Sequence, residues 1–284
     1  MTDITIRYQD KPLFQRAEFS LPTRYNSNLQ DYSCFFYINK GSYQIIEANG
    51  IFKVGEKEAL LKKCGNYVSY FPSSEETNRA EAIAVYFHTD IIKSIYSNEI
   101  VDFLNKSNRR STPKKVANEL IEKYVNNLVI YLDNPSLIDD ELAVLKFKEL
   151  ILILMKSQYC DSVQTFFGDL FNSQKLEFKT IIENNIFNDL SVEELAFICN
   201  KSLSSFKRLF KANFNETPAR YIKRRRLEQA ARLISTTSES ISHIAYDCCF
   251  KDPTTFSAVF SDHFGVSPTI YRNQSRKHLT ETSK

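Results

Sequence analysis

The chain has 284 residues, of which 43% are hydrophobic and 13% aromatic, so it holds enough apolar material for the cores of two domains. This composition excludes a disordered or low-complexity protein. The net charge is +3, but residues 172–284 hold 17 Lys and Arg against 12 Asp and Glu, whereas residues 1–171 hold 20 against 22. Because phosphates attract basic surfaces, this asymmetry favours a nucleic-acid partner for the C-terminal part.

The first ninety residues have β character. Aromatic and β-branched residues gather in segments 4–8, 33–40, 43–48, 67–71 and 82–88. Turn signals at Gly41, Gly50 and Gly65 separate them. Short strands at this spacing predict a small antiparallel barrel or sandwich, between which periodicity does not distinguish. The many Tyr and Phe residues of this region have two interpretations, a filled core or a pocket for an apolar or carbohydrate-type ligand.

From Ile91 onward the apolar spacing becomes helical. A polar break at residues 105–113 precedes the clearest example of this spacing. One predicted stripe consists of Val116, Leu120, Tyr124, Leu128 and Tyr131. A second helix over residues 137–159 contains an apolar run at 150–155, too short to span a bilayer. This run is either a helix face buried against the barrel or a seam between two copies of the chain. Residues 162–175 are expected to join the two halves.

The last hundred residues contain a diverged repeat of a short helix, a tight turn and a second helix, which is the layout of a helix-turn-helix. The apolar anchors recur about fifty positions apart: Val192, Leu195 and Ala196 as Ile241, Ile244 and Ala245; Phe206, Leu209, Phe210 and Phe214 as Phe256, Val259, Phe260 and Phe264; Pro218 and Tyr221 as Pro268 and Tyr271. Two such units predict a protein that binds double-stranded DNA in successive major-groove segments.

Capping signals predict where these helices begin. Ser191 and Glu194 have the spacing of a capping box, which places a helix start near Val192. Caps are predicted at four further starts, namely Ser202, Thr217, Asp252 and Ser267. The helix over residues 218–235 carries a basic run at 223–226, whose members either contact phosphates, pair with Glu228 or are solvated.

Helical spacing sorts the second helix of each unit into two faces. If the phenylalanines of the first unit face the core, the opposite stripe is Ser204, Lys207, Arg208 and Lys211. In the second unit it is Thr254, Ser257, Ala258 and Ser261, without charge. A basic stripe is often only a solvated face, but here it lies where a helix-turn-helix meets DNA. The first unit is therefore predicted to supply most base readout, with Arg208 placed to pair with guanine or phosphate.

Residues 190–272 resemble the DNA-binding domain of the AraC/XylS family of bacterial transcription regulators. The resemblance is carried by Ile244, Ala245, Tyr246, Phe250, the segment 256–260, the segment 263–268, Tyr271, Arg272, and by Tyr221, Arg224, Arg226, Leu227 and Glu228. It implies seven helices, two helix-turn-helix units and DNA contacts from both recognition helices. Two positions depart from the family pattern: Cys249, where glycine is common, and Ala258, where arginine is frequent.

On this resemblance, Ser204, Lys207 and Arg208 fall on contact positions of the first recognition helix, and Pro253, Thr254, Thr255, Ser257 and Ala258 fall on those of the second. The predicted contact residues are Ser204, Lys207, Arg208, Lys211, Lys251, Thr254, Thr255 and Ser257. For the N-terminal half it implies a cupin-like β-barrel followed by dimerisation helices, and in many members a small-molecule effector in the barrel. We therefore expect an α+β protein with a barrel and linker-helix domain at residues 1–161 and an all-α DNA-binding domain with two helix-turn-helix units at residues 172–276.

Other signals restrict the function. No signal peptide opens the chain, and the six cysteines lack the paired spacing of zinc sites. His88 is the one histidine of residues 1–171, so a metal-binding cupin is not expected. We expect a cytoplasmic protein with reduced thiols, no membrane association, no metal and no other cofactor.

The favoured function is a sequence-specific transcription regulator that binds promoter DNA as a homodimer and acts on RNA polymerase, with a small-molecule effector as a further partner. One alternative is an architectural or interaction module with non-specific DNA affinity. The other is an enzyme built on the barrel, which is disfavoured because the sequence shows no histidine cluster, no nucleophile with an evident base and no phosphate-binding glycine loop.

Overall fold

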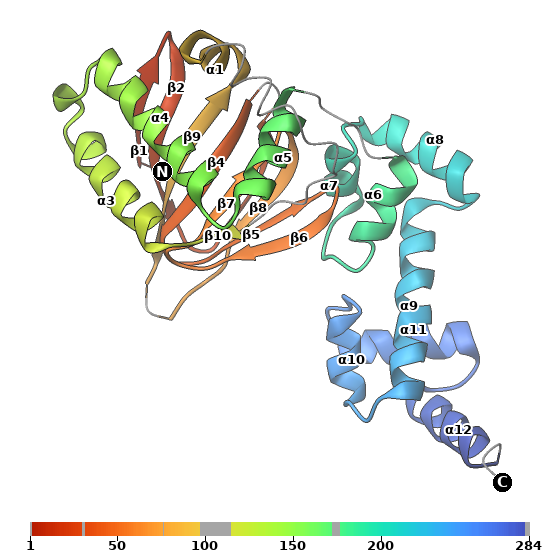
Figure 1. The fold of residues 1–284 in the computed structure, drawn as a ribbon. Helices are drawn as coiled ribbons and strands as arrows, with labels where there is room; N and C mark the ends of the chain where they lie inside the picture. Colours follow the sequence, from red (N-terminus) through yellow and green to blue (C-terminus); the bar gives the residue numbers. More distant parts are fainter. Residues whose placement is uncertain (1, 30–31, 76, 97–114, 172–176, 282–284) are drawn as a thin grey trace. The chain divides into compact units, whose positions relative to one another are not determined.

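The computed structural model describes residues 2–29, 32–75, 77–96, 115–171 and 177–281, and it divides the chain into two compact units, Met1–Leu176 and Glu177–Lys284 (Figure 1). The first unit is an antiparallel β structure with helices, and the second is all-α, which confirms the predicted α+β class. The predicted polar break at 105–113 lies outside the described residues. None of the described helices is both long and apolar enough to cross a membrane.

The strands of the first unit form two antiparallel sheets. The first has the order β1 (Thr2–Tyr8), β2 (Lys11–Ser20), β9 (Arg79–His88), β4 (Tyr32–Lys40), β7 (Ala59–Lys62) and β10 (Lys115–Val116). The second has the order β3 (Thr23–Leu29), β8 (Gly65–Phe71), β5 (Tyr43–Glu47) and β6 (Gly50–Val54). Residues of both sheets, among them Phe19, Phe36, Tyr43 and Phe71, share one apolar cluster. The sheets therefore enclose the interior of a small barrel.

The five predicted β segments correspond to β1, β4, β5, β8 and β9, but the sequence prediction missed the other strands. The clearest miss is β3, whose sequence TRYNSNL reads as a loop. It forms a strand because it pairs along its whole length with β8, from Thr23 opposite Phe71 to Leu29 opposite Gly65. Its residues also alternate between half-buried and exposed. Cross-strand pairing thus outweighs weak local β propensity here.

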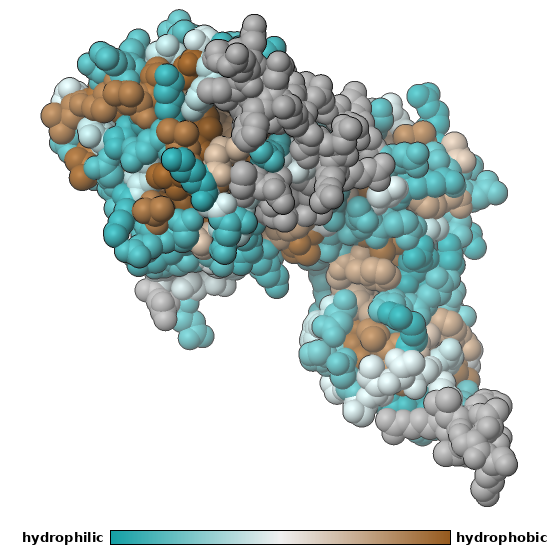
Figure 2. Space-filling view, viewed as in Figure 1, coloured by the Kyte–Doolittle hydropathy of each residue, from teal (hydrophilic) through white to brown (hydrophobic). Residues whose placement is uncertain are grey.

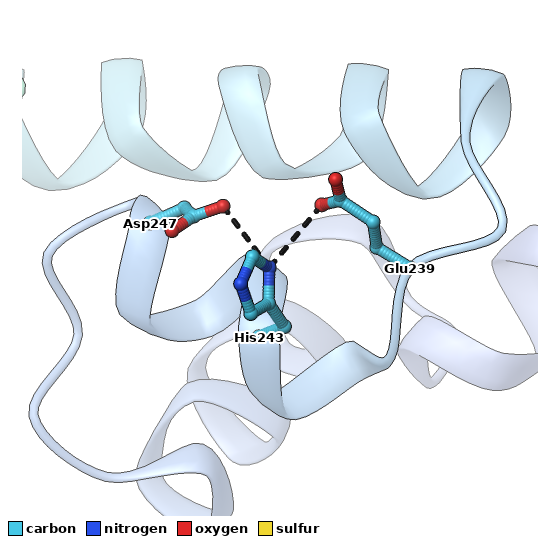
Figure 3. Close-up of side chains that lie close together, drawn as sticks. All are labelled: Glu239, His243 and Asp247. Atoms are coloured by element: carbon cyan, nitrogen blue, oxygen red, sulfur yellow. Dashed lines mark hydrogen bonds and ion pairs between the residues drawn. The ribbon is translucent and has the colours of Figure 1, made fainter.

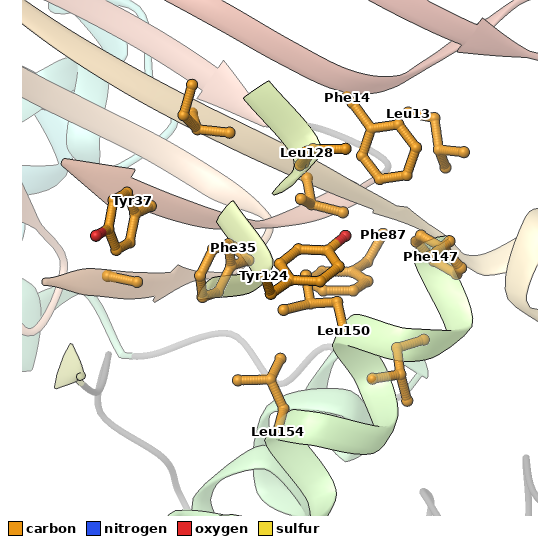
Figure 4. Packing of buried hydrophobic residues seen from close by; sticks show 14 of the residues in the cluster. Leu13, Phe14, Phe35, Tyr37, Phe87, Tyr124, Leu128, Phe147, Leu150 and Leu154 are labelled. Carbon is orange, nitrogen blue, oxygen red and sulfur yellow. The ribbon is translucent and has the colours of Figure 1, made fainter. Parts of the chain in front are cut away.

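A second apolar cluster forms on one face of the six-stranded sheet, and the helices that contribute to it include α3 (Glu119–Asp133), α4 (Asp140–Lys156) and α5 (Cys160–Phe171). Figure 4 shows Tyr124 and Leu128 of α3 and Leu150 and Leu154 of α4 near Phe87 of β9. In the apolar run at 150–155, burial against the sheet is therefore confirmed for Leu150, Ile151 and Leu154, whereas Leu152 is 54% exposed.

Two details of this helical region differ from the sequence prediction. Leu120 belongs to the predicted apolar stripe but is 62% exposed, because α3 turns Ile121, Val125 and Leu132 inward instead. Helix α5 occupies residues that we expected to join the two halves. The first unit also contains α1 (Thr89–Ile95) and the short 3₁₀ helix η1 (Pro135–Leu137).

The described part of the second unit contains seven helices: α6 (Phe178–Asn185), α7 (Val192–Ile198), α8 (Leu203–Phe214), α9 (Pro218–Thr236), α10 (Ile241–Asp247), α11 (Pro253–Phe264) and α12 (Pro268–Glu281). The predicted repeat is visible in the aromatic packing. The ring centroids of Phe210 and Phe214 lie 4.5 Å apart, as do those of Phe260 and Phe264. Tyr221 and Tyr271 pack on these pairs from the helix that follows each unit.

Most predicted caps are formed. The Ser191 side chain accepts from the Glu194 amide while the Glu194 carboxylate accepts from the Ser191 amide, so the capping box is confirmed. Ser202 and Asp252 cap α8 and α11 in the predicted way. Thr217 is the exception, because it stands at the cap position but its side chain makes no capping hydrogen bond. The start of α9 has Pro218 at its first position, whose fixed φ suits a helix start.

Candidate nucleic-acid interface

Each candidate recognition helix follows a turn that contains a left-handed residue. Asn200 has φ +53° in the turn between α7 and α8, and Cys249 has φ +61° between α10 and α11. Asparagine tolerates this conformation, whereas a Cβ such as that of cysteine makes it unfavourable. The second turn is also one residue longer than the first. Cys249, which stands where glycine is common, therefore holds a strained left-handed conformation in this turn.

Helix α8 presents its basic face to solvent. Ser204, Lys207, Arg208 and Lys211 are all exposed, while Phe206 and Phe210 on the opposite face are fully buried. Within the part of the chain that the structure describes, no carboxylate lies within 4.0 Å of Lys207, Arg208 or Lys211. The ion pairs of this unit are formed by other residues. Three cations on one helix face thus lack intramolecular neutralisation, which favours an anionic partner.

Helix α11 offers a different surface. Lys251, Thr254 and Thr255 are exposed, but Ser257 is half-buried. The Ser257 hydroxyl donates to the Pro253 carbonyl oxygen at 2.9 Å. A serine has a single hydroxyl proton and phosphate oxygens are acceptors. Ser257 must therefore give up this bond before it can donate to DNA.

The N-terminus of α11 carries a negative charge. The Asp252 carboxylate accepts from the Thr255 amide at 2.6 Å, and hydrogen bonding to Thr255 lowers the pKa of Asp252 below its ordinary value. An ionised carboxylate at this position caps the helix well but repels a phosphate. Together with the uncharged stripe, this makes α11 electrostatically weaker than α8 towards DNA.

The three arginines of the basic run in α9, Arg224, Arg225 and Arg226, are engaged within the protein. Arg224 pairs with Glu228 at 2.7 Å and with Glu216 at 3.2 Å, so the intrahelical pairing interpretation holds for this residue. Arg225 donates to Glu183 at 2.9 Å. Lys223 is exposed and is the member of the basic run left facing solvent.

Arg226 connects backbone segments from both parts of the unit. Its guanidinium donates to the carbonyl oxygens of Ile186 at 3.0 Å, Asn188 at 2.7 Å and Cys249 at 3.4 Å. The first two lie just before α7, and the third lies in the turn before α11. Sequence reasoning missed this role because Arg226 stands in a run of basic residues and carries no local signal that distinguishes it.

An exposed group of three titratable side chains lies at the start and along one face of α10. Figure 3 shows His243 between Glu239 and Asp247, with Nδ1 at 3.4 Å and 3.2 Å from their carboxylate oxygens. The three ligand-type atoms lie within 4.8 Å of one another. Because each carboxylate is one helical turn from the imidazole, the arrangement follows from i, i+4 spacing alone.

The barrel interior contains a cavity of about 210 Å³ lined by residues of both sheets. Phe19, Tyr25, Phe36 and Tyr86 are among its walls. Phe19 and Phe36 belong at the same time to the apolar cluster that contains Phe71, so aromatic residues both fill the core and line a pocket. His88 lies elsewhere, with Nε2 2.9 Å from the Pro12 carbonyl oxygen, and burial lowers the pKa of its ring. This contact gives His88 a structural role.

Two family models match the chain. A helix-turn-helix domain matches residues 195–274, which include both turns and both candidate recognition helices. The ExsA N-terminal regulatory domain matches residues 33–166, which include much of the barrel and the helices α3 and α4. The two matches together account for both units of the chain.

Individual relatives are transcription regulators. The transcriptional activator RhaR of Mannheimia succiniciproducens is 36% identical over 110 residues, which cover 32% of this chain and 40% of that protein. The activator RhaS of the same organism is 26% identical over 180 residues, covering 62% of this chain and 65% of that protein. The chain thus spans less than two thirds of the length of these curated relatives. Among solved structures, ToxT from Vibrio cholerae is 16% identical with a TM-score of 0.39, covering 93% of this chain and 99% of that one.

Proposed function

We propose that this chain, which belongs to the AraC/XylS family of transcription regulators, binds specific promoter DNA through helices α8 and α11. The observation that carries this proposal is the exposed basic face of α8, whose cations Lys207, Arg208 and Lys211 have no carboxylate partner in the described parts of the unit. A helix-turn-helix places this face in the major groove. The basic excess of residues 172–276 supplies the attraction to phosphates.

The contact residues take different roles in this proposal. Arg208 forks onto guanine O6 and N7, because its planar guanidinium matches these two acceptors. Lys207 and Lys211 bind phosphates, and Ser204 adds a hydroxyl at the same face. In the second helix-turn-helix, α11 is positioned on the DNA backbone and reads few bases. The residues that make these contacts are Lys251, Thr254, Thr255 and Ser257.

The predicted N-terminal domain, residues 1–161, is proposed to hold the homodimer contact and an effector site. Figure 2 shows apolar side chains at the surface over α3 and α4. Leu145 and Leu152, one heptad apart on α4, are 56% and 54% exposed, which suits a helix seam between two copies. In this proposal, the protein works in the cytoplasm. A small molecule that binds in the barrel cavity changes how the DNA-bound protein acts on RNA polymerase.

The proposal is tested with the operator itself. Genome-wide mapping of bound DNA identifies candidate sites, and binding of the full chain to a matched and a scrambled duplex is then measured across a salt series. A specific regulator keeps an affinity ratio of roughly 10³ or more. A ratio near one that vanishes with salt would instead identify a non-specific DNA-binding module.

Arg208→Ala tests the residue-level assignment. We expect a loss of about 1–3 kcal/mol on the operator and relaxed preference at one base position. The matched control is Arg232→Ala, which removes an exposed arginine of the same unit that contacts only Gln229 among the described residues. Equal losses from Arg208→Ala on all variants of the operator sequence would contradict base readout.

Leu152→Glu tests the dimer contact. It should shift the full chain towards monomer in sedimentation, and an unchanged dimer would contradict the α4 seam.

A further inference from the structure

The group of Glu239, His243 and Asp247 at α10 combines an imidazole with two carboxylates on one exposed surface. Figure 3 shows the imidazole between the two carboxylates. Their side chains are 46%, 62% and 50% exposed in chain order, so an ion in solution reaches all three. A mixed set of one nitrogen and two oxygen donors suits Zn²⁺, whereas Mg²⁺ and Ca²⁺ prefer oxygen ligands alone.

The distances within this group match a zinc ligand set. Zinc binds histidine nitrogen and carboxylate oxygen at about 2.0–2.2 Å, usually in a tetrahedron, so two of its ligand atoms lie about 3.4 Å apart. His243 Nδ1 lies 3.4 Å from a Glu239 oxygen and 3.2 Å from an Asp247 oxygen. All three ligand-type atoms lie within 4.8 Å of one another. The side chains thus provide three ligand positions, and a water molecule would complete the tetrahedron.

Charge also favours a divalent cation at this position. With a neutral imidazole the group carries two negative charges, which one Zn²⁺ ion would neutralise. Among the described residues, His243 is the basic side chain that lies within 4.0 Å of the Glu239 and Asp247 carboxylates. Arg272 approaches Glu239 as well, but it donates to the backbone carbonyl oxygen at 2.7 Å. The backbone that carries Glu239 is therefore fixed, while its carboxylate is directed at His243.

The first helix-turn-helix lacks this group. When Val192 is aligned with Ile241, the three residues correspond to Leu190, Glu194 and Ile198. Glu194 has a ligand-type side chain, but it is engaged in the capping box with Ser191. Leu190 and Ile198 are buried apolar residues. A helix-turn-helix of this chain thus forms without the three donors, which leaves them free for a role particular to α10.

We propose that Glu239, His243 and Asp247 bind one Zn²⁺ ion, which clamps the segment before α10 to both turns of this seven-residue helix. Helices this short are unstable by themselves, and an ion that binds only the folded arrangement stabilises it by mass action. Because α10 shares an apolar cluster with α11, the ion would also support the second recognition helix. The sequence expectation of no metal rested on cysteine spacing and on the histidine content of residues 1–171, neither of which concerns α10.

Calorimetry of the full, reduced chain with zinc chloride, with and without excess magnesium chloride, tests the ligand set. We expect one zinc site whose affinity falls at least about tenfold in His243→Ala and in Asp247→Asn, since even the loss of an outer-shell partner weakens a metal site by that factor. Magnesium should not compete. His263→Ala is the matched control and should leave the affinity unchanged, because His263 is also exposed but the histidine–carboxylate pairs among the described residues involve His243.

Two further measurements report the clamp and the ligand atoms. With zinc at ten times its dissociation constant, the α10 amides should exchange about elevenfold more slowly in the parent chain and at an unchanged rate in His243→Ala. Cobalt in place of zinc should give a spectrum of nitrogen and oxygen ligands without a thiolate charge-transfer band. Such a band would place the ion on cysteines, of which Cys248 and Cys249 follow Asp247 directly in the chain.

Several results would overturn the zinc site. They are no zinc binding by the full chain, equal zinc affinity of His243→Ala, equal competition by magnesium, unchanged α10 exchange, or a cobalt spectrum dominated by thiolate bands. Circular dichroism confirms the fold of each variant, which should persist because all the substituted side chains are exposed. The measurements contain no DNA. A chain that binds zinc here but no promoter would overturn the regulatory function and leave this site standing.

Discussion

Replacing Arg226 by alanine should destabilise the DNA-binding unit rather than remove a phosphate contact. Its guanidinium makes two hydrogen bonds at 3.0 Å and 2.7 Å to Ile186 and Asn188 and a longer one at 3.4 Å to Cys249. A hydrogen bond from a charged donor contributes about 1.5–3 kcal/mol. Because Arg226 is half-buried, we take the lower end for the two short bonds and little for the third, which gives about 2–4 kcal/mol in all.

The assay is hydrogen exchange of α9 amides in the full chain, which reports the opening free energy of this unit by itself. Arg226→Lys keeps the charge but loses the fork, so it should lose more than half of the stabilisation. Arg232→Ala is the control and should change the opening free energy by less than about 0.5 kcal/mol, as exposed substitutions do.

DNA-binding measurements distinguish a structural role of Arg226 from a phosphate contact. A phosphate contact would reduce the salt slope of binding by about one unit upon substitution and leave stability unchanged. The structure predicts an unchanged slope and lower stability. If Arg226→Ala leaves α9 exchange unchanged while the slope falls, the three carbonyl contacts are not what holds this residue in place.

Two further predictions concern single residues. Burial raises the pKa of Glu47, so the folded protein favours the protonated carboxyl. The stability that this carboxyl contributes is fully present below its ordinary pKa of 4.5, and it is lost as the pH rises through the raised pKa. Glu47→Gln should therefore unfold at a higher temperature than the parent at pH 7.5 and at the same temperature near pH 4, and a constant difference would contradict this. Cys249→Gly should stabilise the unit by about 0.5–1 kcal/mol, since glycine relieves the left-handed strain at the expense of chain entropy and the Cys249 thiol contact to Phe187. A urea titration of the full chain measures this gain, and Asn200→Gly in the first turn should be near neutral in it. A loss of stability at Cys249 would show that the thiol contact outweighs the strain.

Helix starts and faces of the second unit were predictable from sequence because they depend on neighbours within four residues. The Ser191–Glu194 box, the Asp252 cap and the exposure of Arg208 all follow from helical period and local hydrogen bonding. The same local logic failed for β3, whose polar residues form a strand only through pairing with β8. It also misplaced Leu120, because the helix phase depends on which side meets the sheet.

Long polar side chains show most clearly what local sequence patterns cannot predict. Arg226 reaches Asn188, 38 residues away, and Lys62 reaches Tyr43 on the opposite sheet. Neither partner can be read from residues nearby in the chain. The repeat, the capped helices and the basic face of α8 can be read from the residues alone, since periodicity is a local property. The inward turn of particular arginines and the burial of a lysine in the barrel depend on segments that folding brings together from far apart, so they become visible only in the folded chain.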